Sequence, residues 1–263
     1  MQIKILGCSG GIGGELLTTS MLVDHDILID AGTGVGDLSM EELLAIDHIF
    51  VTHSHLDHIA FIPLLLDTVM GIRTKPVTVH ATQETLATLC THIFNWKVWP
   101  DFNAIPDKIQ PFLLYNEVKL DEMINIHGRK FTPIPANHVI PAIGYQVDSG
   151  ENSLVFTGDT TVCDELWRKV NEIDNLKYLI IETAFSNSEY ELAALSMHLC
   201  PATLATELSK LKIKQNATFA NNQVEVFITH LKPGESEIIM REIAESGLTP
   251  SPQALKNNQV FHL

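Results

Sequence analysis

Four potential metal ligands stand within six residues of this chain, directly behind an apolar segment. Residues 50–58 read Phe-Val-Thr-His-Ser-His-Leu-Asp-His, which places His53, His55, Asp57 and His58 together. Neutral imidazoles and carboxylates are the ligands that zinc and similar divalent cations prefer. The alternative is a solvated polar loop, but three imidazoles between two apolar stretches are unusual in a loop that binds no cation. The segment therefore predicts a metal site, and the chain must fold so that further ligands reach this strand end.

The local pattern indicates how these side chains point. Residues Ile46 to Thr52 have the composition of a buried strand, and His53 and His55 continue its two-residue alternation, so both are expected on one side. Asp57 stands where a helix is expected to begin, and apolar residues follow at helical spacing. His58 would then point in a different direction from His53 and His55, which favours two adjacent ions.

Three further candidate ligands each follow a strand-like run: His138 after Arg129–Pro135, Asp159 after Leu154–Gly158 and His230 after Val224–Thr229. Strand ends converge at the edges of folded sheets, so these side chains can complete a site that begins at residue 53.

The order His-x-His-x-Asp-His, then His, Gly-Asp and Thr-His resembles that of the metallo-β-lactamase fold hydrolases over nearly the whole chain. The resemblance implies one metal held by His53, His55 and His138, a second held by Asp57, His58 and His230, and Asp159 bridging the two. Asp30, in Leu-Ile-Asp-Ala-Gly, matches the acid that orients the first motif in that family. Two divalent ions are thus expected as cofactors, with zinc favoured and manganese or iron as alternatives.

Composition agrees with one domain over residues 1–263, because 45% hydrophobic content in a chain of this length can bury a large core. We expect an α+β fold, a four-layer αββα sandwich of two mixed sheets with helices outside. Two segments are expected to be surface loops, Asp101–Pro111 and Lys212–Gln223. Strands are expected at 2–6, 20–30, 46–52, 77–80, 112–118, 129–135, 143–148, 153–157, 178–182 and 224–228.

Two more motifs bear on the reaction. Glu182 lies in Ile-Ile-Glu-Thr-Ala-Phe, and His198 lies in Ser-Met-His-Leu-Cys-Pro. They resemble a Glu and a His-Leu pair shared by ribonuclease Z and class II cyclic-nucleotide phosphodiesterases. The sequence His-Leu-Asp-His at 55–58 also resembles the metal motif of these phosphodiesterases. Ala60 departs from the glycine or serine usual just after that motif, which weakens a strict assignment without touching a ligand.

The resemblance implies a dinuclear metal-dependent phosphodiesterase that opens a small 3′,5′-cyclic nucleotide, such as cAMP or cGMP, to the 5′-monophosphate by attack of a metal-activated hydroxide. His198 is the candidate proton donor to the leaving 3′ oxygen, and Glu182 is expected to hold its ring and stabilise the cationic form. Asp57 is expected to orient or deprotonate the attacking water. A structural role is the alternative for His198, but the paired Glu182 favours catalysis.

Other functions use the same fold. A ribonuclease Z-like transfer RNA endonuclease is one alternative, but a formal net charge of −15 repels a long nucleic-acid backbone. A small anionic phosphodiester can still bind, since two divalent ions would reverse the local potential. A thioester or lactone hydrolase is a second alternative, because fold alone does not fix chemistry. A purely structural metal is a further alternative. Structural metal sites are usually closed by four ligands, so the seven candidate ligands argue against it.

Two segments leave their roles open. Glycines cluster at 7, 10, 11, 13 and 14 but fit neither a P-loop nor Gly-x-Gly-x-x-Gly, so we interpret them as a turn at one edge of the active site rather than as a phosphate loop. The aromatic side chains Trp96, Trp99 and Phe102 suit base stacking, a homodimer contact or core packing.

The four cysteines are far apart in sequence, so we expect reduced thiols and a cytoplasmic location. The chain starts with a strand-like segment instead of an export leader, and no apolar run approaches the roughly 20 residues of a membrane helix.

Overall fold

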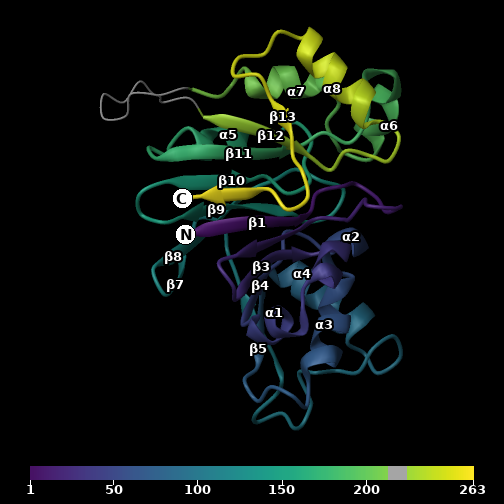
Figure 1. Ribbon diagram of the computed structural model, residues 1–263, viewed down its shortest axis with the longest axis vertical. Coiled ribbons are helices and arrows are strands. Elements are labelled where there is room, and N and C mark those ends of the chain that lie inside the picture. The colour runs from purple at the N-terminus through teal and green to yellow at the C-terminus, as the bar shows by residue number, and fades with distance from the viewer. Residues whose placement is uncertain (213–223) are drawn as a thin grey trace.

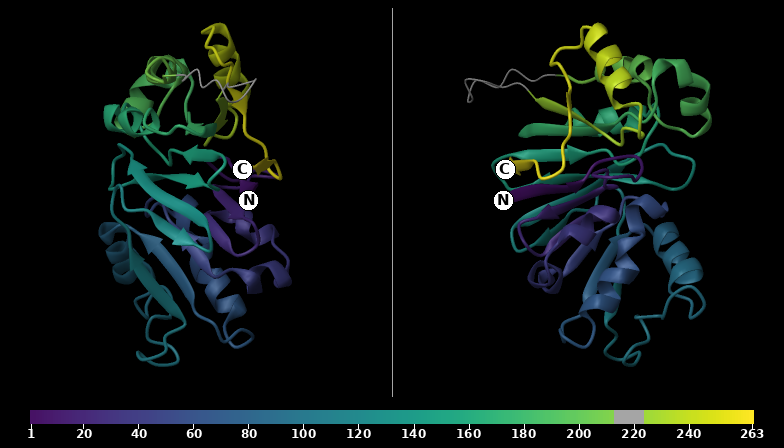
Figure 2. Two further views of the ribbon diagram at one scale, coloured as in Figure 1. Left: turned by 90° about the vertical axis from the view of Figure 1, so that its left-hand side faces the viewer. Right: turned by 45° about the vertical axis from the view of Figure 1, so that its right-hand side comes forward.

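The computed structural model of the chain describes residues 1–212 and 224–263. In this described part, two mixed sheets of seven strands each form the centre of the molecule, and helices cover the outer face of each sheet (Figure 1). The two further views in Figure 2 show the same separation, with the purple and blue helices on one side and the green and yellow helices on the other. The predicted αββα sandwich is therefore confirmed.

The first sheet contains most of the N-terminal half of the chain and one C-terminal strand. Strands β3, β4, β5 and β6 run parallel, whereas β1 pairs antiparallel with both β2 and β14. Its strands in spatial order are β14 (Val260–His262), β1 (Gln2–Gly7), β2 (Ser20–Val23), β3 (Ile27–Ala31), β4 (His48–Phe50), β5 (Val77–Ala81) and β6 (Leu113–Glu117).

The second sheet places four strand ends at one edge. Strands β10, β11, β12 and β13 are parallel, and β8 has the same direction as β10 because β9 lies antiparallel between them. Its strands in spatial order are β13 (Gln253–Ala254), β12 (Glu225–Thr229), β11 (Leu176–Glu182), β10 (Ser153–Phe156), β9 (Ile143–Asp148), β8 (Arg129–Pro135) and β7 (Ile124–Ile126).

Three buried apolar clusters hold the layers together. One lies between the sheets and includes stacked Phe50 and Phe131, whose ring centroids are 4.1 Å apart. The other two lie between each sheet and its helices. The helices are α1 (Met40–Ala45), α2 (Leu56–Ile59), α3 (Phe61–Val69), α4 (Gln83–Thr88), α5 (Asp164–Val170), α6 (Tyr190–Leu195), α7 (Pro201–Leu208) and α8 (Ser236–Glu245), with short turns η1 (Thr33–Asp37), η2 (Leu89–Ile93) and η3 (Asn187–Glu189).

Several predicted elements differ in extent. The single strand expected at 20–30 is two antiparallel strands, because Asp24 adopts a left-handed conformation and turns the chain. The strand expected at 46–52 is limited to β4, and the helix expected to begin at Asp57 begins one residue earlier, at Leu56. The short strands β7, β13 and β14 were not predicted, since two or three residues are too few for a periodic pattern.

The segment Asp101–Pro111 contains no helix or strand, as expected of a loop, but Phe102 within it is fully buried. The other predicted loop, Lys212–Gln223, lies outside the described residues from position 213 onward.

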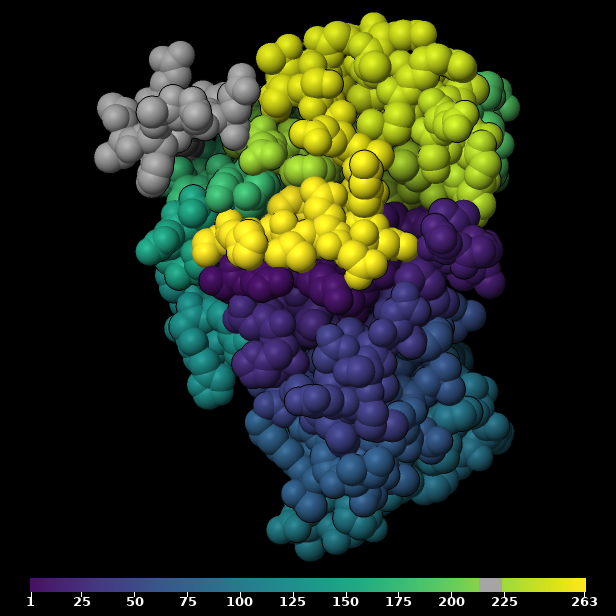
Figure 3. Space-filling model, viewed as in Figure 1, coloured from purple at the N-terminus to yellow at the C-terminus, as the bar shows by residue number. Residues whose placement is uncertain are grey.

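The first and last described strands are neighbours, since β1 pairs with β14 from Gln2 opposite His262. Figure 3 shows this pairing on the surface, where the yellow C-terminal residues lie along the purple first strand. All four cysteines are free thiols. Among the described residues, every helix is too short or too polar to cross a lipid bilayer.

Candidate metal centre

Every candidate ligand lies just beyond the carboxyl end of a strand. The segment 53–58 follows β4 in the first sheet, whereas His138, Asp159 and His230 follow β8, β10 and β12 in the second. Because these strand ends meet at one edge of the sandwich, the structure brings together all seven side chains that the sequence proposed as ligands.

The first cluster contains three imidazole nitrogens that converge on one point. His55 Nδ1 lies 3.1 Å from His53 Nε2 and 3.2 Å from His138 Nε2. Asp159 Oδ2 lies 3.6 Å from His53 Nε2. Ligand atoms about 2.0–2.1 Å from a tetrahedral zinc ion are about 3.3 Å from one another, so these spacings suit a single ion.

The second cluster shares Asp159 with the first. Its Oδ2 lies 3.4 Å from His58 Nε2, and its Oδ1 lies 3.4 Å from His230 Nδ1. Asp57 Oδ2 completes the group at 3.8 Å from both His58 Nε2 and His230 Nε2. The Asp159 carboxylate therefore faces both clusters, in the position of a bridge.

Hydrogen bonds behind the clusters select the ring nitrogen that faces the site. His58 Nδ1 donates to Asp30 Oδ2 at 2.7 Å, and His138 Nδ1 donates to the Met197 carbonyl at 3.1 Å. The Thr52 hydroxyl donates its proton to Asp30 Oδ2 at 2.8 Å. The oxygen of the same hydroxyl can therefore accept a hydrogen bond from His53 Nδ1 at 3.0 Å. These partners favour the proton on Nδ1 in His53, His58 and His138, which leaves the Nε2 lone pair of these three rings for a cation.

Asp30→Asn tests this arrangement. We expect roughly 10- to 100-fold weaker metal binding, because the amide cannot replace a carboxylate as acceptor for both Thr52 and His58. Competition with a chelator of known affinity measures the change. Asp37→Asn, on the nearby turn η1, is the control, and equal affinities of the two variants would contradict an orienting role for Asp30.

Burial and charge make the site suitable for a cation. Burial lowers the pKa of His53 well below its usual value, which keeps the ring neutral. Burial alone would raise the pKa of Asp159, but His230 and His58 hold it well below its usual value. His58 Nε2 and His230 Nδ1 are buried and have no hydrogen-bond partner among the described residues, which is costly unless something binds there. The residues thus fit two metal ions.

Glu182 and His198 form a buried pair beside both clusters. His198 Nδ1 donates to Glu182 Oε1 at 2.8 Å, and the same carboxylate accepts from the backbone N–H of Thr160, next to Asp159. The His198 ring centroid is 4.9 Å from that of His138 and 5.1 Å from that of His230. Burial opposes the charged form, but the Glu182 carboxylate raises the pKa of His198 above its usual value.

Sequence reasoning missed three contributors to the site. Thr52 and the Met197 carbonyl orient ligand rings, and Lys232 places its ammonium 3.3 Å from His230 Nε2. A lysine two residues after a ligand was a visible signal. The Met197 carbonyl gave no such signal, because every residue has a backbone carbonyl. Met197 adopts a left-handed conformation, which turns its carbonyl toward His138.

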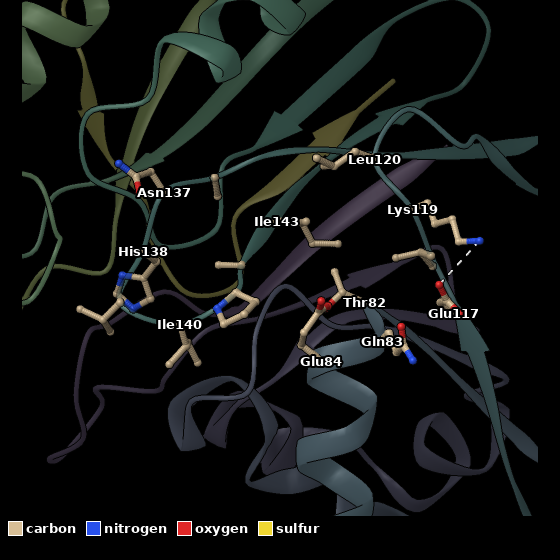
Figure 4. Close-up of a pocket in the computed structure, with 15 residues that line it drawn as sticks. Thr82, Gln83, Glu84, Glu117, Lys119, Leu120, Asn137, His138, Ile140 and Ile143 are labelled. Carbon is tan, nitrogen blue, oxygen red and sulfur yellow. Dashed lines mark ion pairs between the residues drawn. The ribbon is translucent and has the colours of Figure 1, made fainter.

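A groove of about 630 Å³ opens beside His138. Figure 4 shows His138 and Ile140 on one wall and Thr82 and Glu84, at the start of α4, on another. Its lining mixes apolar side chains with carboxylates and amides, and the groove offers room next to the first cluster for part of a small molecule.

The aromatic segment has divided roles. Phe102 is fully buried, so neither base stacking nor a subunit contact applies to it. Trp99 packs against the cluster under the first sheet and is half-buried, which favours core packing. Trp96 is 64% exposed and keeps the other two interpretations open.

Comparisons with known proteins agree with this geometry. A sequence profile of the Beta-lactamase superfamily domain matches residues 25–234. The chain is 25% identical over 206 residues to a probable 3′,5′-cyclic-nucleotide phosphodiesterase of Yersinia pestis, across 72% of this chain and 58% of that protein. It is 31% identical over 157 residues to ribonuclease Z of Clostridium beijerinckii, across 55% of this chain and 48% of that protein. The matches therefore span about half the length of these curated relatives.

The crystal structure of unliganded yeast PDE1 superimposes with a TM-score of 0.78 at 20% identity, covering 100% of this chain and 99% of that one. The fold and the paired clusters define a metallo-β-lactamase fold protein with a site suited to two metal ions. The chain belongs to the Beta-lactamase superfamily domain family.

Proposed function

We propose that this chain is a dinuclear metal-dependent phosphodiesterase that hydrolyses a small 3′,5′-cyclic nucleotide to the 5′-monophosphate. The observation that carries the proposal is the buried Glu182–His198 pair, which lies within ring contact of a ligand from each cluster. A proton donor in that position serves a leaving alkoxide, which is the difficult part of opening a cyclic phosphodiester.

The residues divide the work as follows. Two divalent ions in the clusters would activate a water and neutralise charge on the phosphoryl oxygens. Asp57, whose side chain is 28% exposed, is open to solvent and is placed to orient that water. His198 donates a proton from Nε2 to the 3′ oxygen, because its Nδ1 proton is committed to Glu182. The groove beside His138 offers space for the nucleoside.

The relatives support a phosphodiester substrate. The Yersinia pestis protein and a yeast protein 24% identical to this chain over 206 residues carry names of 3′,5′-cyclic-nucleotide phosphodiesterases. The net charge of −15 favours a small anion over a long nucleic acid, as the sequence suggested. A homodimer through the exposed Trp96 surface and zinc as the resident metal stay predictions.

Hydrolysis assays test the proposal directly. Protein loaded with zinc, and separately with manganese, is assayed on 3′,5′-cAMP, 3′,5′-cGMP and bis(p-nitrophenyl) phosphate. We expect turnover of the last substrate and of at least one nucleotide. Two bound ions with no turnover of any of the three would contradict the proposal, and thioesters and lactones would be tested next.

Glu182→Gln should move the pH dependence. The Glu182 carboxylate raises the pKa of His198, so activity on a cyclic nucleotide falls as pH rises through that raised value. Glutamine removes the charge, so the fall should begin at lower pH and the rate at alkaline pH should drop by about tenfold or more. Glu245→Gln, at the exposed end of α8, is the control. An unmoved profile would argue against Glu182 tuning the acid.

The second candidate function is a ribonuclease Z-like endonuclease, which the 31% identity to the Clostridium beijerinckii protein favours. A gel-shift assay with transfer RNA at moderate salt separates the two. Retention of transfer RNA together with its cleavage would replace the small-substrate proposal.

A further inference from the structure

Lys232 places a positive charge at the rim of the second cluster. It lies two residues beyond His230, is half-buried, and its Nζ donates to the Gly10 carbonyl at 2.8 Å. The same nitrogen is 6.0 Å from the centre of the Phe185 ring, which also contacts His198. Its charge is close enough to oppose protonation of both His198 and His230. Lys232 therefore lies beside His230 of the second cluster and near the Phe185 ring, which contacts His198.

The Lys232 ammonium has more hydrogen-bond donors than it has acceptors among the described residues. It can donate three hydrogen bonds, and its neighbours among the described residues are the Gly10 carbonyl and His230 Nε2, at 3.3 Å. His230 cannot accept once its ring binds a cation. If Nδ1 is the ligand, Nε2 carries the proton, and if Nε2 is the ligand, its lone pair is occupied. Two donors then remain for a ligand at the site.

The glycine cluster holds the lysine in place. A Cβ at Gly10 would lie 2.5 Å from the His230 carbonyl oxygen and 3.0 Å from Lys232 Cδ. A Cβ at Gly11 would lie 2.7 Å from the Pro233 ring. Only glycine allows the loop to approach this closely, so the Gly10 carbonyl can hold Nζ while the lysine stem packs beneath the loop. The loop thus lies at one edge of the metal centre and supplies an anchor for a cation.

We propose that Lys232 binds an anionic phosphoryl oxygen of the substrate and so selects charged phosphodiesters over neutral esters. The inference rests on the proposed function and deepens it by assigning substrate recognition to a residue outside the metal ligands. Lys232 Nζ lies 3.3 Å from His230 Nε2, at the edge of the second cluster, so its fixed charge would add to that of two bound ions in attracting an anion.

The test measures anion binding apart from catalysis. Inorganic phosphate is titrated calorimetrically into zinc-loaded protein after free zinc is removed, and metal content is measured for every variant. Lys232→Met should weaken phosphate binding by about 10- to 100-fold, since one charge-assisted hydrogen bond is lost. Lys232→Arg should retain most of the affinity. Lys177→Met, at the end of β11 opposite Glu182, is the matched control and should bind phosphate as the native chain does.

Kinetics then separate recognition from a structural role. For bis(p-nitrophenyl) phosphate, Lys232→Met should raise KM by a factor similar to the loss of phosphate affinity, with kcat changed by less than about threefold. Unchanged phosphate affinity and KM would overturn the inference. If the methionine variant does not fold, Lys232→Gln replaces it, because the amide can still donate to Gly10. Loss of metal from both uncharged variants would show a structural role and also overturn it.

The two proposals fail in different ways. A native chain that hydrolyses phosphodiesters but binds phosphate independently of Lys232 refutes only the role of this residue. A native chain without phosphodiesterase activity, in which Lys232→Met still weakens phosphate binding, refutes the proposed reaction and keeps the anion site.

Discussion

Replacing His198 by alanine is expected to lower the turnover of 3′,5′-cAMP by about 10²- to 10⁴-fold, the usual contribution of a general acid. The 3′ oxygen leaves as a strongly basic alkoxide, and His198 is the side chain held by Glu182 beside both clusters. His198 is not in either ligand cluster, so metal content should be unchanged. Steady-state kinetics with metal analysis of the same samples measures both.

The choice of substrate makes this result specific. p-Nitrophenolate leaves without a proton, so His198→Ala should slow bis(p-nitrophenyl) phosphate hydrolysis by less than about tenfold. His262→Ala, on an exposed position of β14, is the matched control. Equal losses on both substrates would show that His198 acts by shaping the site and not by donating a proton.

Asp159→Ala is expected to have the largest effect of a single substitution. Asp159 is the one residue common to both clusters, and it is only 2% exposed. Its loss should weaken metal binding by more than the roughly 10- to 100-fold expected for an outer hydrogen-bond partner, and activity should fall below about 1% of the native rate. Metal analysis, kinetics and a thermal melt of the same preparation measure the three consequences.

The melt decides between two roles for the metals. A folded Asp159→Ala protein without activity indicates a catalytic centre, whereas unfolding indicates that the ions serve as a structural staple. Asp164→Ala, on the exposed start of α5, should change neither metal content nor activity. Retention of both ions and of activity in Asp159→Ala would refute the bridging position.

The layers of the fold were predictable because the longer strands, of five to seven residues, contain short runs or alternations of apolar side chains. Thus β8 and β11 were expected nearly where they lie. The extent of β4 was not predictable, since Val51 continues the apolar pattern and still donates its N–H to the His80 carbonyl of β5, whereas Thr52 bonds to Asp30 through its N–H and its hydroxyl. There a side-chain contact with a residue 22 positions away overrides the local pattern.

The ligand types were readable because histidine and aspartate are rare in such density, but their pairing in space came from the family resemblance. Backbone groups and single common residues gave no signal. The Met197 carbonyl orients His138 only because the chain turns sharply before His198. The position of Lys232 beside the site depends on its hydrogen bond to the Gly10 carbonyl. Such contacts join positions up to 222 residues apart, beyond the reach of any local motif.

Each ligand cluster joins the two halves of the sandwich, since His53, His55, Asp57 and His58 follow a strand of the first sheet and His138, Asp159 and His230 follow strands of the second. Bound ions would act as clamps between the halves, and the free energy of their binding would add to that of folding by mass action. Heat resistance would then rise with the free concentration of metal. In a cell, the lifetime of this protein would follow the metal supply, and a shortage would remove the protein as well as its activity.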